Sequence, residues 1–218
     1  MAGRVVVAFL ILLLVNCKGG VKEKTDTKGS SIALKEISVD FDGSPLTGWE
    51  VTNFGPQGPV YVSGDEIILG MGDGCTGITW KGNFPSINYE VSLDARRIEG
   101  NDFFCGLTFP KGKDPCTLII GGWGGTTVGL SSIDGLDASD NSTRTLMKFD
   151  KNRWYHIRLS VTFNKIQAWI DSLMVVDFAI STNKLSIRPE VELSKPFGIT
   201  SWNTTAALRN IKVNSYGK

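Results

Sequence analysis

Carboxylates in loops are the side chains of this sequence best suited to acid–base chemistry. Asp102 follows the turn sequence EGN, and Asp134 and Asp137 lie three residues apart in the loop SSIDGLDASD. Cleavage of a glycosidic bond needs two carboxyl groups, about 5–5.5 Å apart for retention and about 6.5–9.5 Å apart for inversion. Asp102, Asp134 and Asp137 are therefore candidate catalytic residues, with Asp140 and Glu192 as further candidates.

Two other roles for these carboxylates stay open. In loops rich in glycine and serine they commonly cap turns and face water. Oxygens of Asp134, Asp137, Asp140 and Asn141 also suit Ca²⁺, which takes six to eight oxygen ligands, although their spacing is not that of an EF-hand. No cofactor is required by the sequence, and calcium is the one candidate.

Two tryptophans are suited to binding sugars, because an aromatic ring stacks on a sugar while polar groups bind its hydroxyls. Trp123 lies between glycine pairs in GGWGG, which leaves its ring unobstructed, and Trp202 lies near a strand end. An alternative is that both rings fill the core. The candidate polar contacts are Arg96, Arg97, Asp102, Arg144 and Asn203.

Other site chemistries fit poorly. The glycine-rich segment has Gly122 and Gly124, but Thr127 stands where a dinucleotide-binding loop needs its third glycine, and a strand follows instead of a helix. The single histidine, His156, lies in a strand, and no Gly-x-Ser-x-Gly motif accompanies it. We expect His156 to lie on a sheet surface.

Short alternating segments must position these residues, and no stretch shows helical periodicity over a normal helix length. We therefore predict an all-β fold, a two-sheet antiparallel sandwich of about 12–13 strands. The predicted strands are 60–62, 66–69, 77–80, 89–98, 103–109, 116–121, 127–133, 145–149, 154–163, 165–170, 174–178, 197–202 and 207–214.

Three cysteines lie after residue 31, and an odd number cannot all pair within the domain. If the strands around PKGKDP form a hairpin, Phe109 faces Cys116 and Cys105 lies four residues further along. That offset is about 13 Å, too far for a disulfide. Cys75, Cys105 and Cys116 are thus predicted to be buried free thiols.

The N-terminus has the pattern of an export signal. Arg4 precedes the apolar run 5–15, which is too short to span a bilayer. The end of the run, LVNC, resembles a lipobox, which implies lipid attachment at Cys17, although Asn16 departs from the usual small residue. We predict a signal peptide over 1–17, a polar tether over 18–31 and a domain over 32–218, anchored in the cell envelope or else secreted.

Charge gives no support for nucleic-acid binding. The first 31 residues hold 5 of the 23 basic and 2 of the 22 acidic residues, so the domain keeps 18 basic and 20 acidic residues, a net charge of about −2.

Three segments carry a family resemblance: FDGSPLTGWEV, ARRIEGNDFFCGLTF and RWYHIRLSVTFNKIQAWIDSLMVVDF. Over about 39–213 the chain resembles the bacterial 3-keto-disaccharide hydrolase family. That resemblance implies a laminin-G or concanavalin A-like jelly roll that acts on oxidised disaccharides outside the cytoplasm. Family members commonly carry Glu-x-Gln-x-x-Asp on the strand where this chain reads CTLIIGGWGG.

The sequence therefore leaves the function open between classes. The first hypothesis is a 3-keto-glycoside hydrolase-like enzyme that uses the candidate carboxylates. The alternative is a carbohydrate-binding or surface-adhesion lipoprotein without catalysis, and a purely structural envelope lipoprotein is a third. Carbohydrate and the membrane are the expected partners.

Overall fold

Strands dominate residues 35–37 and 46–216, the part of the chain that this computed structural model describes. Fifteen strands are present there, and the helix in that part is the 3-10 helix η1 (Pro189–Ser194). The all-β prediction is confirmed. No helix in the described ranges is long and apolar enough to span a membrane.

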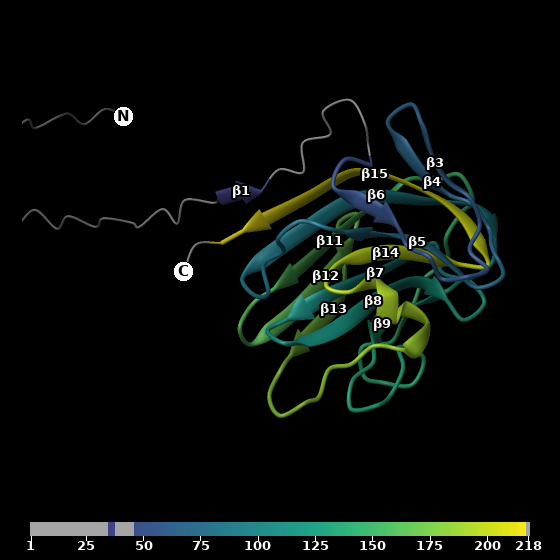
Figure 1. Cartoon of the computed structure of the whole chain (residues 1–218). Coiled ribbons are helices and arrows are strands. Elements are labelled where there is room, and N and C mark those ends of the chain that lie inside the picture. Colours follow the sequence, from purple (N-terminus) through teal and green to yellow (C-terminus); the bar gives the residue numbers. More distant parts are fainter. Residues whose placement is uncertain (1–34, 38–45, 217–218) are drawn as a thin grey trace, which may run out of the picture. The chain divides into compact units, whose positions relative to one another are not determined.

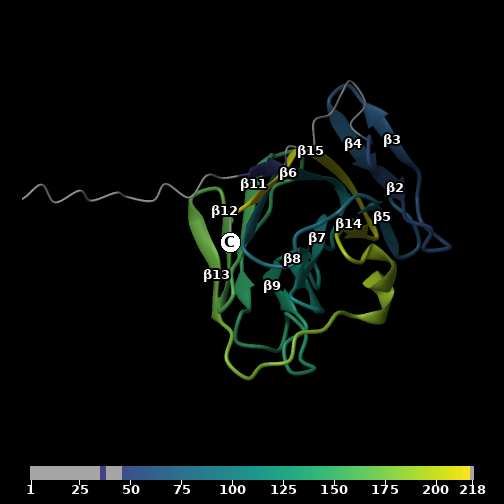
Figure 2. The same ribbon diagram turned by 60° about the vertical axis from the view of Figure 1, so that its left-hand side comes forward.

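The strands form two antiparallel sheets that pack face to face as a sandwich (Figures 1 and 2). Sheet A runs in the order β13 (Leu173–Ala179), β12 (Lys165–Ile170), β11 (Tyr155–Val161), β6 (Tyr89–Gly100), β15 (Thr204–Ser215), β4 (Glu66–Leu69) and β3 (Val60–Ser63), with β1 (Lys35–Ile37) also paired to β15. Sheet B runs in the order β10 (Thr145–Leu146), β9 (Thr127–Ser131), β8 (Asp114–Gly122), β7 (Cys105–Lys111), β14 (Gly198–Trp202), β5 (Cys75–Trp80) and β2 (Trp49–Val51).

Alternation along the strands builds the core. In β11, Tyr155, Ile157, Leu159 and Val161 alternate with less buried residues and are themselves buried in the core. The alternate residues of that strand lie on the outer face of sheet A, because successive side chains of a strand point to opposite sides. The largest fully buried side chains are Tyr89, Tyr155, Phe104, Phe109 and Phe197.

The hairpin of β7 and β8 has the predicted register. Phe109 pairs with Cys116, and Cys105 pairs with Ile120. Cys75, Cys105 and Cys116 are buried free thiols, as predicted. Burial raises the pKa of both Cys105 and Cys116 to about 12, so these thiols are neutral core residues.

Three short elements escaped the prediction, whereas each of the 13 predicted ranges overlaps a strand. These elements are β1, β2 and η1, and the two strands have only three residues each. A three-residue strand is too short to show alternation, and the six residues of η1 are too few to show helical periodicity.

The outer face of sheet B is the one that positions a site. On β8, Cys116, Leu118 and Ile120 belong to the core, so Thr117 and Ile119 point to the opposite side. Small residues occupy the neighbouring outward positions. Gly106 pairs with both Ile119 and Thr200, and a Cβ on Gly106 would lie 2.8 Å from the Thr200 hydroxyl oxygen. Short side chains therefore leave a depression in this part of the outer face of sheet B.

Candidate functional site

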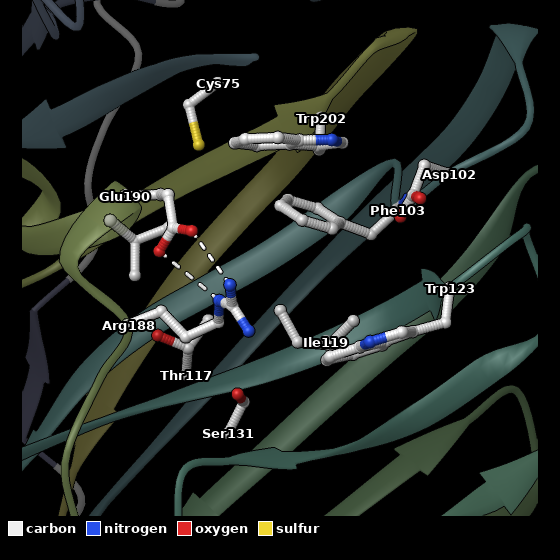
Figure 3. A pocket seen from close by; sticks show the side chains of 11 residues that line it. Cys75, Asp102, Phe103, Thr117, Ile119, Trp123, Ser131, Arg188, Glu190 and Trp202 are labelled. Atoms are coloured by element: carbon white, nitrogen blue, oxygen red, sulfur yellow. Dashed lines mark hydrogen bonds and ion pairs between the residues drawn. The ribbon is translucent and has the colours of Figure 1, made fainter. Parts of the chain in front are cut away.

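A pocket of about 200 Å³ opens in the depression on the outer face of sheet B. Its floor comes from outward residues of β8 and β9, which the sheet register places side by side: Thr117 pairs with Ser131. Figure 3 shows Arg188 and Glu190 at one end of the pocket, Asp102 and Trp123 at the other, and Phe103 and Ile119 between them. The lining residues are Cys75, Asp102, Phe103, Thr117, Ile119, Trp123, Ser131, Arg188, Glu190, Val191 and Trp202.

Three aromatic rings form one side of the pocket. The rings of Phe103 and Trp202 lie 6.4 Å apart at an angle of 32°, and the Trp202 backbone N–H donates to the Phe103 carbonyl (3.0 Å). Trp123 lies in the turn after β8 and is 41% exposed. An exposed tryptophan beside two further rings is an available stacking surface.

The Trp123 backbone is strained, because its φ is 47°, in the left-handed region that bulky residues rarely adopt. Left-handed backbone costs a non-glycine residue about 1–2 kcal/mol. Such strain concentrates at functional sites, where the surrounding structure maintains it. Of the four glycines around Trp123, Gly121, Gly124 and Gly125 also have positive φ values (79°, 85° and 100°).

Arg97 holds the Trp123 turn in place from inside the domain. It points inward from β6, is 5% exposed, and its Nη2 donates to the carbonyls of Asp102 (3.0 Å), Gly121 (3.2 Å) and Gly125 (3.1 Å). The side chain thus connects sheet A to both segments that carry the aromatic end of the pocket. Burial lowers the pKa of Arg97, while the Asp102 carboxylate opposes that shift.

An ion-pair cluster forms the other end of the pocket. Arg188 donates from Nη2 (2.8 Å) and Nε (3.3 Å) to the two carboxylate oxygens of Glu190, and from Nη1 to Asp137. The hydrogen bonds from Arg188 lower the pKa of Glu190. Glu190 is therefore ionised at neutral pH and holds no proton to donate to a leaving group.

Asp102 is the second carboxylate of the pocket. Its Oδ1 accepts a hydrogen bond from the Phe103 backbone N–H (2.7 Å), and its own N–H donates to Thr204 Oγ1 (3.1 Å). Asp102 forms no ion pair with another described residue, in contrast to Glu190. Of the three predicted catalytic residues, Asp102 is the one that lines the pocket.

Asp134 and Asp137 support the loop beside the pocket instead. Asp134 accepts hydrogen bonds from the Lys184 N–H and from Asn183 Nδ2, both at 2.7 Å. The Lys184 backbone bond is the main cause that lowers the pKa of Asp134. Asp137 accepts from the hydroxyls of Ser131 (3.2 Å) and Ser132 (2.9 Å) besides Arg188.

The remaining predicted contact residues lie outside the pocket lining. Arg96 is on the outer face of sheet A, paired with Glu66 (2.7 Å) and stacked on Trp154 (4.7 Å). Arg144 is exposed and follows the loop that carries Asn141. Asn203 has a φ of 43° and its Oδ1 accepts from the Gly74 N–H (2.7 Å), so it holds a turn.

Two further predictions concern metal and lipid. Asp140 accepts a bond from the Ser139 hydroxyl, and the amide of Asn141 donates to two backbone carbonyls. Among the described residues, no group of three or more His, Cys, Asp or Glu side chains is arranged to hold a metal. Cys17, the predicted lipid attachment point, lies outside the described residues.

His156 lies on the outer face of sheet A, as expected from its strand position. Its Nδ1 is 2.8 Å from Asp94 Oδ1, and 53% of its side chain is exposed. Cys75 lines the pocket with its thiol. Burial, with a smaller contribution from the nearby Glu190 carboxylate, raises the pKa of that thiol to about 12. Neither residue is therefore an activated nucleophile of the pocket.

The sequence has a family match over most of its length. A family model described as the 3-keto-alpha-glucoside-1,2-lyase-like domain matches residues 36–214. The chain belongs to this family. A search among curated protein sequences found no match.

Solved structures with the same fold include several carbohydrate-active proteins. The carbohydrate-binding module CBM66 from Bacillus subtilis has a TM-score of 0.53 at 17% identity, covering 77% of this chain and 96% of that chain. Domain 4 of the GH43 extracellular arabinanase AbnA from Geobacillus stearothermophilus, solved with arabinotriose, has a TM-score of 0.55 at 15% identity, covering 84% and 93%. These structural similarities show the fold alone, a jelly-roll sandwich.

The 3-keto-alpha-glucoside-1,2-lyase-like domain of this chain lacks acidic residues on the pocket floor. The resemblance noted in the sequence places the family's Glu-x-Gln-x-x-Asp pattern at β8, whose outward residues here are Thr117 and Ile119. The carboxylates of the pocket come from outside β8, on the segments that hold Asp102 and Glu190.

Sequence reasoning missed the charged end of the pocket. Arg188 and Glu190 flank Pro189 in SIRPEVELS, a stretch without strand alternation. A proline followed by two acidic residues, Glu190 and Glu192, is a signal for the first turn of a short helix. That signal does not say which face of which sheet the helix covers.

Proposed function

We propose that this domain binds carbohydrate in the pocket on the outer face of sheet B. The observation that carries the proposal is the arrangement of three rings, Phe103, Trp123 and Trp202, opposite the Arg188–Glu190 pair (Figure 3). Aromatic faces pack on the C–H faces of sugars, and fixed ionic groups hydrogen-bond to hydroxyls. Family membership and the carbohydrate-binding modules that share the fold support the same conclusion.

A second function, cleavage of a 3-keto-glucoside by elimination, is favoured by the position of Asp102. A 3-keto group acidifies the proton on C2 of the sugar, so one base is sufficient. Asp102 would take that proton, the C2–H electron pair would form the C1–C2 double bond, and the C1–O bond would break, with the leaving oxygen gaining a proton from water. Hydrolysis would need two carboxyl groups, one of them protonated, whereas Glu190 is ionised beside Arg188.

Titration calorimetry of the full chain against trehalose, sucrose and their 3-keto derivatives tests binding. Trp123→Ala and Trp202→Ala should each weaken binding by about 10- to 30-fold, since central aromatic residues contribute about 2 kcal/mol. Trp169→Ala is the matched control, because this ring lies 3.9 Å from the Arg158 guanidinium on sheet A, away from the pocket. Equal losses in all three variants, or no binding by the unaltered chain, would reject the site.

Turnover of the keto-sugars, followed by the release of the second sugar, tests the elimination. Asp102→Asn should abolish turnover while keeping binding, and Asp134→Asn, outside the pocket, should retain it. Turnover that survives in Asp102→Asn would assign the base to another residue. No turnover by the unaltered chain on any keto-glycoside would leave binding as the function.

The cellular location is also a proposal. We propose that the domain works outside the cytoplasm, anchored by a lipid on Cys17, because the N-terminus resembles a lipoprotein signal. Metabolic labelling with a tagged fatty acid should label the chain and leave Cys17→Ala unlabelled. Equal labelling of both would reject this attachment point.

A further inference from the structure

The segment after β13 forms a wall beside the pocket. Residues 183–186 run next to residues 132–134, joined by Ser132 N–H to Ser186 O (2.7 Å), the reciprocal Ser186 bond (3.1 Å) and Asp134 N–H to Lys184 O (2.8 Å). The two hydrogen bonds that the Asp134 carboxylate accepts from Asn183 and Lys184 reinforce this pairing. The wall is thus fixed along its length.

The wall continues as η1 and covers the outer face of sheet B at β5 and β14. A Cβ on Gly198 would lie 2.7 Å from the Ser194 carbonyl oxygen, so η1 is in direct contact with the sheet there. Thr79 Oγ1 donates to the Leu193 carbonyl (3.1 Å), and Val191 and Ser194 are buried. No room remains for a ligand on that part of the face.

A second segment covers the same face at β9. A Cβ on Gly129 would lie 3.1 Å from Thr143 Oγ1 and 3.2 Å from the Ala138 Cβ, so the loop 137–143 packs directly on the strand. Thr143 Oγ1 also accepts the Leu130 N–H (2.9 Å). The pocket therefore lies between two covers on one sheet face.

The Arg188–Asp137 ion pair connects the two covers. Arg188 precedes η1, and Asp137 begins the loop over β9. Asp137 is bound at the same time by the hydroxyl of Ser131, a floor residue of the pocket. Figure 3 shows Arg188 at the end of the pocket opposite Trp123, so the bridge that Arg188 forms with Asp137 lies at that charged end.

We propose that this bridge closes one end of the pocket, so that the site takes the terminal sugar of a chain and excludes internal sugars. This inference depends on the proposed carbohydrate binding. The pocket volume of about 200 Å³ is below the roughly 300–1,000 Å³ of sites for drug-sized ligands. A chain lying across the sheet would need open space at both ends of the site, and the bridge occupies one of them.

Binding measured against chain length tests the proposal. The titrants are glucose oligosaccharides of one, two, three and six units, with a cyclic glucose oligosaccharide, which has no terminal unit, as the contrast. We expect the affinity per oligosaccharide molecule to vary by no more than about twofold across the linear series, and we expect no binding of the cyclic sugar. Affinity that rises tenfold or more with length, or binding of the cyclic sugar, would overturn end recognition while leaving carbohydrate binding intact. Failure of every sugar, with the keto-sugars included, would reject the proposed function itself.

Opening the bridge is the second arm of the test. Asp137→Ala should admit the cyclic and longer sugars, with at least a fivefold gain over the unaltered chain, and near-UV circular dichroism should remain native. Asp171→Ala is the control, since it breaks an ion pair of similar exposure, Arg153–Asp171 (2.8 Å), away from the pocket. Selectivity unchanged in a natively folded Asp137→Ala would overturn the role of the bridge. If that variant does not fold, Arg188→Met, which keeps the apolar stem, replaces it in the same comparison.

Discussion

The outer faces of the two sheets differ in how their side chains are occupied. On sheet A, long side chains bind one another, as in Arg96–Glu66 (2.7 Å), Arg158–Glu90 (3.1 Å) and Lys165–Asp177 (2.7 Å). Trp154 lies under the guanidinium groups of Arg96 (4.7 Å) and Arg209 (4.1 Å). On sheet B, short side chains leave a depression with an exposed tryptophan.

This difference separates polar groups that stabilise from those that can bind a ligand. These charged side chains of sheet A already have partners, and the Trp154 ring is already stacked. Surface pairs of this kind contribute about 0–1 kcal/mol each. A sugar would have to displace such partners on sheet A, whereas on sheet B it would find open rings above a floor of small residues. The outer side chains of sheet A are thus paired with one another, whereas the outer face of sheet B is available to bind a ligand and is here called the receptive face.

The adjacent residues Arg96 and Arg97 allow the largest test of this comparison. Arg97→Met removes the donor for three backbone carbonyls, so we expect the free energy of unfolding to fall by about 3 kcal/mol and sugar binding to be lost. Arg96→Met, one residue away on the other face, should cost at most about 1 kcal/mol. Urea unfolding and calorimetric titration measure both effects.

Arg97→Lys distinguishes positioning from fold stability. A lysine keeps the charge but cannot reach three carbonyls with a planar fork. Binding weakened more than tenfold, at a stability loss near 1 kcal/mol, is the expected result. A loss of sugar affinity no larger than the loss of unfolding free energy explains would show that Arg97 acts only through the stability of the fold.

Trp123→Gly should separate binding from stability. Affinity should fall about 30-fold, because the stacking surface is lost, whereas the unfolding free energy should stay level or rise by about 1 kcal/mol as the φ of 47° is relieved. Trp169→Ala should behave in the opposite way, with lower stability and unchanged affinity. The same two assays apply, and a stability loss above 1 kcal/mol in Trp123→Gly would contradict the strain.

Acid should weaken the charged end of the pocket. The folded-state pKa of Glu190 is lowered by its hydrogen bonds from Arg188, so its stabilising contribution is complete above the unfolded pKa of about 4.3. The contribution is lost as pH falls through the lower folded value. Sugar affinity should therefore be level between about pH 5 and 8 with respect to this group and fall below about pH 4. Glu190→Gln should remove that acid transition, and a transition that persists in it would belong to another group.

The smallest change in stability and sugar affinity is expected for a substitution on the outer face of sheet A. The Asp94 carboxylate is partly buried, which raises its pKa, but hydrogen bonds from His156 and Asn210 lower it overall. His156→Ala should change stability by about 0.5 kcal/mol or less, because the pair is exposed, and should leave sugar affinity unchanged. Urea unfolding and calorimetric titration of the unaltered chain and of His156→Ala at neutral pH check these two expectations. A tenfold loss of affinity would show that sheet A takes part in binding.

Local pattern was enough to predict the strands but not the partners of loop residues. The bounds of β4 and β12 agree with the predicted ranges, and the Phe109–Cys116 register followed from one turn sequence. Asp134 and Asp137 are candidate catalytic residues in the sequence because they share a loop, where turn capping is the alternative. Their partners, Lys184 and Arg188, lie 50 and 51 positions away, and no local signal connects those positions.

Trp123 and Asp102 were identified from the sequence for a reason that holds locally. A tryptophan between glycines has no neighbouring side chain to obstruct its ring, and a carboxylate in a turn commonly faces water. Asn203 looked similar beside Trp202, but its left-handed backbone and its bond to Gly74 make it a turn residue. A polar side chain in a turn can serve the turn or a ligand, and the sequence is the same for both.

The sequence by itself determined a two-sheet sandwich, its core faces and its unpaired thiols, because alternation and turn chemistry act over a few residues. The tertiary structure decided which outer face is receptive. That face depends on η1 and the loop 137–143 covering parts of sheet B, on the ion pair between Arg188 and Asp137, and on Arg97 reaching from sheet A to the Trp123 turn. The Arg188–Asp137 and Arg97–Gly125 contacts join positions 51 and 28 apart in the chain, so they form only in the tertiary structure, and the Arg97 contact needs the two sheets to be packed.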